Sequence, residues 1–198
     1  MALEDIAMFR AVHGSEVFYP SDAISTERLT EHMARRAGIN YLRTSRPKMP
    51  ILYSKDEKFP VPGFKIRRQS AQDKATVIGA GVTLHEALKA ADQLKSQGVA
   101  IRVLDLYCVK PIDGKAIAEQ INATGGRLIT AEDHWPEGGL GEAVLTALAE
   151  AGASPSKFKL IAVTRMPHSG KPDELIEAFG ISAKHIVEAV RALSLIHI

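Results

Sequence analysis

The stretch ATVIGAGVTLHEALKAADQLKSQGVAIRVLDL, residues 75–106, decides the fold of this chain. It opens with a short β-branched strand at 75–78, continues as an amphipathic helix at 83–97 and ends in a second strand at 101–106. The apolar face of the expected helix consists of Leu84, Ala87, Leu88, Ala91 and Leu94. Such a βαβ unit predicts two parallel strands joined by a right-handed crossover.

The residues that follow continue the alternation of helices and strands. Asp113 is expected to cap a helix that runs to Ile121. Further elements are expected at 127–131 (strand), 140–151 (helix), 158–163 (strand), 172–179 (helix) and 183–193 (helix). Strands that alternate with helices of this length favour a mainly parallel sheet covered on both faces. We therefore predict a three-layer α/β/α domain over residues 71–192.

A shorter α/β unit precedes this domain. Its pattern predicts an amphipathic helix to Val12, a strand at 16–19, a helix at 24–37 and a strand at 39–43. A thin sheet built from these elements would have one poorly covered face, so we expect a further part of the same fold upstream. Residues 1–53 are thus interpreted as a truncated part of a parallel-sheet domain.

The ends of these segments carry local signals. Ser21 or Asp22 can cap the helix at 24–37, and Gly38 can close it in a left-handed conformation. Residues 54–70 follow with a mixture of Pro, Gly and charged side chains that is typical of a linker.

Composition excludes several classes of function. The 198 residues are 45% hydrophobic and 24% charged, and 25 basic against 23 acidic residues give no charge excess for nucleic acid or an anionic membrane. The first residues lack the order of a signal peptide. A single cysteine, Cys108, fits a reducing cytoplasm and is expected to be a small buried side chain.

A basic turn follows the strand at 39–42. Arg43, Thr44, Ser45, Arg46 and Pro47 lie where the carboxyl edge of an α/β sheet commonly binds ligands. Two guanidinium groups can each hold phosphate or carboxylate oxygens in pairs. From the residues alone, the turn is either an anion site or an exposed, partly paired basic loop.

A glycine turn inside the βαβ unit allows two interpretations. Gly79 and Gly81 lie between a strand and a helix, and Asp105 ends the next strand, as in a dinucleotide-binding fingerprint. The third glycine of that fingerprint is replaced by Leu84. A tight turn between strand and helix is therefore favoured over nucleotide binding, which stays a weaker alternative.

An acidic cluster follows the strand at 127–131. Glu132, Asp133 and His134 precede a glycine-rich helix entry at 138–142, and they could form a small metal or acid–base site. Adjacent side chains on a turning backbone point in different directions, which favours a structural loop with a helix cap. No two histidines have the four-residue helical spacing of a zinc site, so we expect no metal ligands.

Taken together, these sequence motifs resemble those of the transketolase family of animals and many bacteria. The resemblance covers residues 1 to about 192. It is carried by Met1–Asp5, Phe18–Asp22, Arg43–Pro47, Thr76–Leu88, Arg102–Asp105, Lys110–Asp113, Glu132–His134, Gly138–Val144 and Ser169–Pro172.

The resemblance implies a thiamine-diphosphate enzyme of the pentose phosphate pathway. Such an enzyme transfers a two-carbon ketol unit from a ketose phosphate to an aldose phosphate, with Mg²⁺, as a cytoplasmic homodimer. Its chain has a diphosphate-binding domain, a pyrimidine-binding domain and a C-terminal domain. This sequence resembles only the end of the second, residues 1–53, and the whole of the third, residues 71–192. We therefore expect no catalytic, cofactor-binding or metal-binding residues here, and neither thiamine diphosphate nor Mg²⁺ is expected to bind this chain alone.

One substrate contact is implied for this chain. Arg46 matches the family's arginine that faces the sugar phosphate at the mouth of the active site, whereas Arg43 is expected to stabilise the domain. Arg46 is the one substrate-binding residue that we predict.

Three interpretations of the chain as a whole remain open. The first is a transketolase fragment that is inactive alone, in which Met1 is an internal methionine and residues 193–198 are a non-native tail matching a translated sequencing adapter. The second is the C-terminal subunit of a split transketolase that needs a partner carrying the missing N-terminal domains. The third is a stand-alone nucleotide-binding α/β module built on Gly79 and Gly81.

Overall fold

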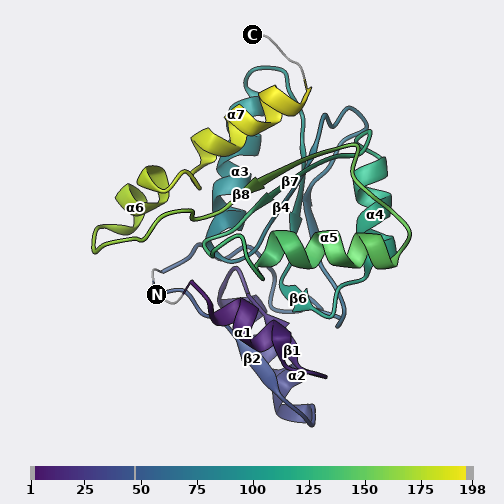
Figure 1. Ribbon diagram of the computed structural model, residues 1–198, viewed down its shortest axis with the longest axis vertical. Helices are drawn as coiled ribbons and strands as arrows, with labels where there is room; N and C mark the ends of the chain where they lie inside the picture. The colour runs from purple at the N-terminus through teal and green to yellow at the C-terminus, as the bar shows by residue number, and fades with distance from the viewer. Residues whose placement is uncertain (1–2, 47, 195–198) are drawn as a thin grey trace.

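A computed structural model describes residues 3–46 and 48–194 of the chain. Residues 1–2, Pro47 and residues 195–198, on which some of the sequence-based expectations fall, lie outside the described residues. The described part forms a small N-terminal unit and a larger α/β domain, which lie against each other (Figure 1).

The N-terminal unit alternates helices and strands as expected. Its elements are α1 (Asp5–Ala11), β1 (Glu16–Phe18), α2 (Ala23–Arg35) and β2 (Asn40–Leu42). Strands β1 and β2 are parallel, with Val17 opposite Tyr41. The other edge of β1 pairs antiparallel with β6 (Cys108–Lys110), which belongs to the larger domain, so the sheet order is β2-β1-β6. The two parts of the chain therefore share one sheet.

The larger domain is built on a five-stranded sheet of order β3-β5-β4-β7-β8. These strands are β3 (Lys65–Arg68), β4 (Thr76–Gly79), β5 (Arg102–Asp105), β7 (Arg127–Ala131) and β8 (Lys157–Ile161). All neighbours pair in parallel except β3 with β5. The expected α/β class with a mainly parallel sheet is confirmed. Strand β3 lies inside residues 54–70, so part of the expected linker belongs to the sheet of the domain.

Helices cover both faces of this sheet. Helices α3 (Val82–Lys95) and α7 (Ala183–Ser194) lie on one face, and α4 (Gly114–Asn122) and α5 (Leu140–Glu150) lie on the other (Figure 1). The short helix α6 (Pro172–Ala178) extends away from the sheet. Successive residues of a strand point into the hydrophobic cores on opposite faces of the sheet. Val77 of β4 packs with α3 and α7, whereas Ile78 packs with α4 and α5.

The strand order creates a switch point at β4. From β4 the chain crosses to β5 on one side, and it later enters β7 on the other. In open α/β sheets the crevice outside the carboxyl ends of such strands is the usual ligand site. Here the N-terminal unit occupies that position, because Tyr19 and Ser21 hydrogen bond to the last residue of β5 and to residues that follow β4 and β7.

One further expectation, that the single cysteine is a small buried side chain, is met. Cys108 is buried, and its Sγ donates to the carbonyl oxygen of Pro111 over 3.1 Å, while burial raises the pKa of the thiol to about 12. Among residues 3–46 and 48–194, no helix is both long enough and apolar enough to cross a membrane.

Candidate functional site

The basic turn after β2 presents its two arginines very differently. Arg43 is buried, and its backbone N–H donates to the carbonyl oxygen of Phe18 over 2.9 Å, which continues the pairing of β1 with β2. Its guanidinium forms ion pairs with Asp5 (Nε to Oδ2, 3.4 Å) and Asp133 (Nη2 to Oδ2, 3.5 Å). Nη2 also donates to the carbonyl oxygen of Asp133 over 2.9 Å. Arg43 is thus part of the scaffold.

Tyr19 lies beneath this arginine. The guanidinium carbon of Arg43 is 4.8 Å from the centre of the Tyr19 ring, a cation–π arrangement. The Tyr19 hydroxyl donates to Asp133 Oδ2 over 3.0 Å and lies 3.3 Å from the Ser45 hydroxyl. Burial raises the pKa of Tyr19 and also that of Asp133, although the charge of Arg43 opposes the increase at Asp133. The tyrosine therefore stays protonated and can act as a hydrogen-bond relay.

Arg46 lies three residues farther along and is exposed. Within the described residues its guanidinium makes no hydrogen bond or ion pair, so its donors are not satisfied by this part of the protein. An exposed guanidinium at the carboxyl edge of a sheet is a group that can bind an anion. The residue types of the turn could not separate the two arginines, because the burial of Arg43 depends on Asp5 and Asp133, which come from distant parts of the chain. The expectation from the family resemblance, that Arg43 stabilises the domain, agrees with these contacts.

The glycine turn after β4 is not open to a ligand. The backbone N–H of Gly81 donates to the Ser21 hydroxyl over 2.9 Å, and that of Val82 reaches the Tyr19 hydroxyl over 3.4 Å. Gly81 has a φ of +51°, and a Cβ at this position would lie 2.1 Å from atoms of the Tyr19 ring. The glycine is therefore needed for close approach of the N-terminal unit. The amides that a nucleotide phosphate would use are already bonded.

Asp105 has a structural environment as well. Its carboxyl is fully buried and accepts hydrogen bonds from the hydroxyls of Ser21 (2.8 Å) and Tyr53 (2.5 Å). Burial raises its pKa to about 7, and the two hydroxyl donors oppose the increase. A ribose-binding acid would point toward solvent, whereas this carboxyl joins the domain to the N-terminal unit.

The acidic cluster after β7 divides into three separate contacts. Glu132 accepts from the N–H groups of Leu140 (2.5 Å) and Gly141 (3.1 Å), so the expected cap of helix α5 is confirmed. Burial raises the pKa of Glu132 to about 8 against the effect of these amides. Asp133 faces Arg43, and His134 accepts from the N–H of Ala7 over 3.4 Å. No group of three or more His, Cys, Asp or Glu among the described residues could hold a metal ion.

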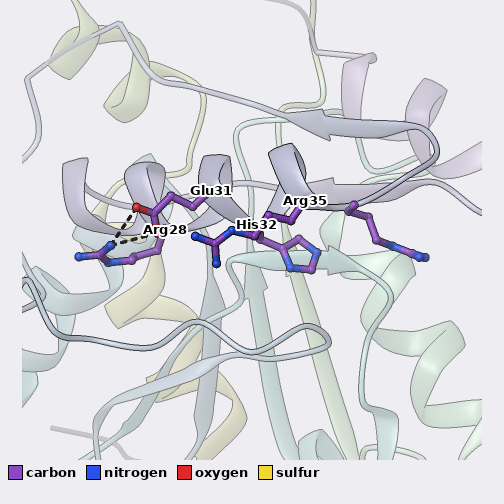
Figure 2. A pocket seen from close by; sticks show the side chains of 5 residues that line it. Arg28, Glu31, His32 and Arg35 are labelled. Carbon is purple, nitrogen blue, oxygen red and sulfur yellow. Dashed lines mark hydrogen bonds and ion pairs between the residues drawn. The ribbon is translucent and has the colours of Figure 1, made fainter.

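A second basic surface lies on helix α2. A hollow of about 250 Å³ lies along this helix and is lined by Arg28, Glu31, His32, Arg35 and Arg36. Figure 2 shows the side chains that line it, with Arg28 paired with Glu31. Carboxylates already accompany most of its basic side chains: Arg28 pairs with Glu31, while His32 and Arg36 share Glu16.

The sequence carried a signal for this surface, because its basic residues recur three and four positions apart on a helix. The internal ion pairs leave Arg35 as its one cation without a partner among the described residues. The charge of the hollow is therefore largely compensated within the protein, which makes it a poor candidate for an anion site.

Comparisons with known proteins give a consistent family. A sequence model described as "Transketolase, C-terminal domain" matches residues 64–186. Transketolase-like protein 2 of Mus musculus is 52% identical over 191 residues, which are 96% of this chain and 30% of that protein. Transketolase of Homo sapiens is 51% identical over 194 residues, which are 98% of this chain and 31% of that protein.

Solved structures agree with these sequence matches. A structure titled "Split gene transketolase, inactive beta4 tetramer" superposes with a TM-score of 0.88 at 32% identity, over 98% of this chain and 62% of the other. Transketolase of Campylobacter jejuni superposes with a TM-score of 0.75 over 97% of this chain and 28% of the other. At 19% identity, the second likeness supports the fold alone.

Proposed function

The chain belongs to the transketolase family, and we propose that it supplies the C-terminal part of a transketolase. The assembled enzyme would transfer a two-carbon ketol unit from a ketose phosphate to an aldose phosphate, in the pentose phosphate pathway of the cytoplasm. The chain spans about 30% of the length of its curated relatives. The remaining domains would come from a longer polypeptide or from a partner subunit.

The observation that carries this proposal is the exposed guanidinium of Arg46 at the carboxyl end of β2. Arg43 is neutralised by Asp5 and Asp133, so Arg46 is the arginine of this turn that can attract the phosphate of a sugar substrate. A guanidinium at this place binds and orients the phosphate and makes or breaks no covalent bond. Its contribution should be similar in the ground state and the transition state.

The described residues do not fit the cofactors of the family. They contain no cluster suited to Mg²⁺, and the glycine turn that could face a diphosphate is filled by Tyr19 and Ser21. We therefore assign thiamine diphosphate and Mg²⁺ to the other domains of the assembly. This chain alone is expected to be inactive and to contribute substrate binding once the enzyme is complete.

A split enzyme is the second form that this function could take. The structural relative with a TM-score of 0.88 is titled a split-gene transketolase and an inactive β4 tetramer. In that form, a separate subunit with the diphosphate-binding domain would join this chain, and the complete enzyme would form a dimer of such pairs. A free nucleotide-binding module has less support, because its backbone donors are bonded to the N-terminal unit.

The proposal can be tested in a chimera in which this chain replaces the matching segment of mouse transketolase, to which it is 51% identical over 194 residues. We expect the chimera to transfer ketol units. In this background Arg46→Ala should raise the KM for phosphorylated substrates about 10- to 100-fold, since charge-assisted hydrogen bonds contribute about 1.5–3 kcal/mol. The kcat should change little.

Lys48→Ala is the matched control, because Lys48 is an exposed cation two residues away. It should leave both kinetic constants nearly unchanged. An Arg46→Ala chimera with an unaltered KM for both donor and acceptor would overturn the assignment of Arg46. Ketol transfer by this chain alone would overturn its dependence on further domains.

A further inference from the structure

We propose that Asp133 is a positioning residue for Arg46. It holds the arginine turn, residues 43–46, at two points, and so it gives the C-terminal domain a part in substrate binding. This inference rests on the proposed function, in which Arg46 binds a sugar phosphate. It concerns a residue that touches no substrate itself.

The first point of attachment is Arg43, where the turn begins. Asp133 meets this guanidinium twice, through its side-chain Oδ2 (3.5 Å) and through its carbonyl oxygen (2.9 Å). Both contacts are buried, so the ion pair is poorly screened by water and salt. Asp5 adds a third acceptor at 3.4 Å, which is itself held by the hydroxyl of Tyr41 at 2.6 Å.

The second point of attachment is Ser45, next to Arg46. The Tyr19 hydroxyl donates its proton to Asp133, so its oxygen is left to accept a hydrogen bond from the Ser45 hydroxyl. The three groups form a chain from Ser45 through Tyr19 to Asp133. Hydrogen bonds in such a chain polarise one another, and the carboxylate at its end strengthens them. Arg46 is therefore the first residue beyond a stretch that is fixed at Arg43 and at Ser45.

Asp133 is well placed to fix other residues because its own backbone is fixed. The N–H of Glu132 donates to the carbonyl oxygen of Ile161 over 2.9 Å, and the N–H of Val163 donates to that of His134 over 3.0 Å. These bonds tie both neighbours of Asp133 to the segment that begins with β8. The position of the turn is thus set by the sheet of the C-terminal domain, across 90 residues of sequence.

The charges explain why two arginines are needed. Arg43 faces two carboxylates, so its charge is compensated within the protein and serves to hold the turn. Arg46 forms no ion pair within 4 Å among the described residues and keeps its charge for a ligand. A misplacement of about 1 Å in such a contact can cost about 100-fold in rate. Loss of Asp133 should therefore weaken substrate binding, because Arg46 would no longer be held in position.

The first experiment measures the mobility of the turn in this chain by ¹⁵N relaxation. In the parent we expect order parameters near those of rigid backbone, about 0.85, at Ser45 and Arg46. Asp133→Asn should lower them below about 0.6 and leave helix α3 unchanged. Glu132→Gln is the matched control, because the neighbouring carboxyl caps α5 and makes no contact with the turn. Unchanged order parameters in Asp133→Asn would overturn the proposal.

The second experiment is a double-mutant cycle in the mouse chimera. Asp133→Asn should raise the KM for phosphorylated substrates about 10-fold with little change in kcat, which a general loss of stability would not do. In the Arg46→Ala background the same substitution should have no further effect, because it acts only through Arg46. Effects on KM that multiply instead would show that Asp133 acts independently and would contradict the proposal.

A replacement variant and the relaxation measurement separate a failure of this proposal from a failure to fold and from a failure of the proposed function. If Asp133→Asn does not fold, Tyr19→Phe takes its place, since it removes the relay hydroxyl and keeps the ring beneath Arg43. It should loosen Ser45 and raise the KM about 3-fold. If Arg46→Ala leaves the KM unchanged, the proposed function fails, while the relaxation experiment still decides whether Asp133 holds the turn.

Discussion

Asp105 is a residue whose protonation should govern the stability of the chain. The carboxyl is fully buried, and the ionisable groups that act on it are Tyr53, Arg67, Asp22 and Tyr107. None of them forms an ion pair with it, although the charge of Arg67 lowers its pKa in part. Burial dominates and raises the pKa from 3.8 to about 7. The folded state therefore favours the protonated carboxyl.

This residue gives a pH-dependent prediction. Between about pH 4 and 7 the folded state binds more protons at Asp105 than the unfolded state, so the free energy of unfolding should fall as the pH rises. With about 1.4 kcal/mol for each pKa unit, ionised Asp105 should cost roughly 4 kcal/mol at pH 8. Asp105→Asn should remove this decline, as measured by urea unfolding at pH 5, 6.5 and 8.

Asp56→Asn serves as the control, because Asp56 is exposed and stays hydrated in both states. This substitution should not change how the free energy of unfolding varies with pH. Glu132 should contribute a separate decline up to about pH 8, so some slope will persist in Asp105→Asn. A slope identical to that of the parent would show that Asp105 ionises without cost in the fold.

At the scale of elements, Asp22 joins a helix to a distant segment. Its Oδ1 caps helix α2 by accepting from the N–H of Ser25 over 2.7 Å. Its Oδ2 accepts from the N–H groups of Leu52 (2.8 Å) and Tyr53 (3.1 Å). One carboxylate thus satisfies a helix end and two amides of the segment that leads into the C-terminal domain.

Asp22→Ala should therefore cost more than the loss of an ordinary helix cap. Asp113 is the matched control, because it caps α4 through the N–H of Ala116 alone, over 3.0 Å. Asp113→Ala should lower the free energy of unfolding by about 1 kcal/mol. Asp22→Ala should lower it by about 3 kcal/mol, since it also leaves two amides without an acceptor. If denaturant titrations show that Asp22→Ala and Asp113→Ala lower the free energy of unfolding equally, Asp22 does not have this double role.

Elements defined by local pattern were predictable from the sequence. The strand at 127–131 and the start of helix α5 at Leu140 agree with the structure to the residue, because their periodicity and caps lie within a few positions. Strands β3 and β6 were not predicted, since β3 forms by pairing with β5, which lies far along the chain, and β6 by pairing with β1 of the other unit. Short antiparallel strands carry too little pattern of their own.

The candidate site was predictable only in part, for a similar reason. The turn at 43–46 could be placed at the end of a strand, and its residue types indicated an anion. Its support could not be seen, because Asp133 and Tyr19 reach it from distant parts of the chain. The glycine turn at 79–81 had an appropriate pattern for a phosphate, and only the structure shows that Tyr19 fills it.

At the scale of the whole molecule, the N-terminal unit and the C-terminal domain are joined at one crevice. The shared pairing of β1 with β6, the buried carboxyls of Asp105 and Asp133 and the ring of Tyr19 all lie along this joint. Small units of this kind gain most of their stability from tertiary packing. The N-terminal unit should therefore unfold together with the domain.

A side chain that is too large for this crevice should make the two parts unfold separately. We expect urea unfolding of the parent to give one transition, seen alike by Trp135 fluorescence and by NMR signals of Leu29 in α2. Gly81→Ala introduces a Cβ 2.1 Å from the Tyr19 ring and should shift the α2 transition to lower urea. Gly98→Ala has a comparable backbone cost at a φ of +76° and meets no atom within 4 Å. It should lower the stability by about 1 kcal/mol with the two transitions still coincident. Coincident transitions in Gly81→Ala as well would show that packing in the crevice does not couple the two parts.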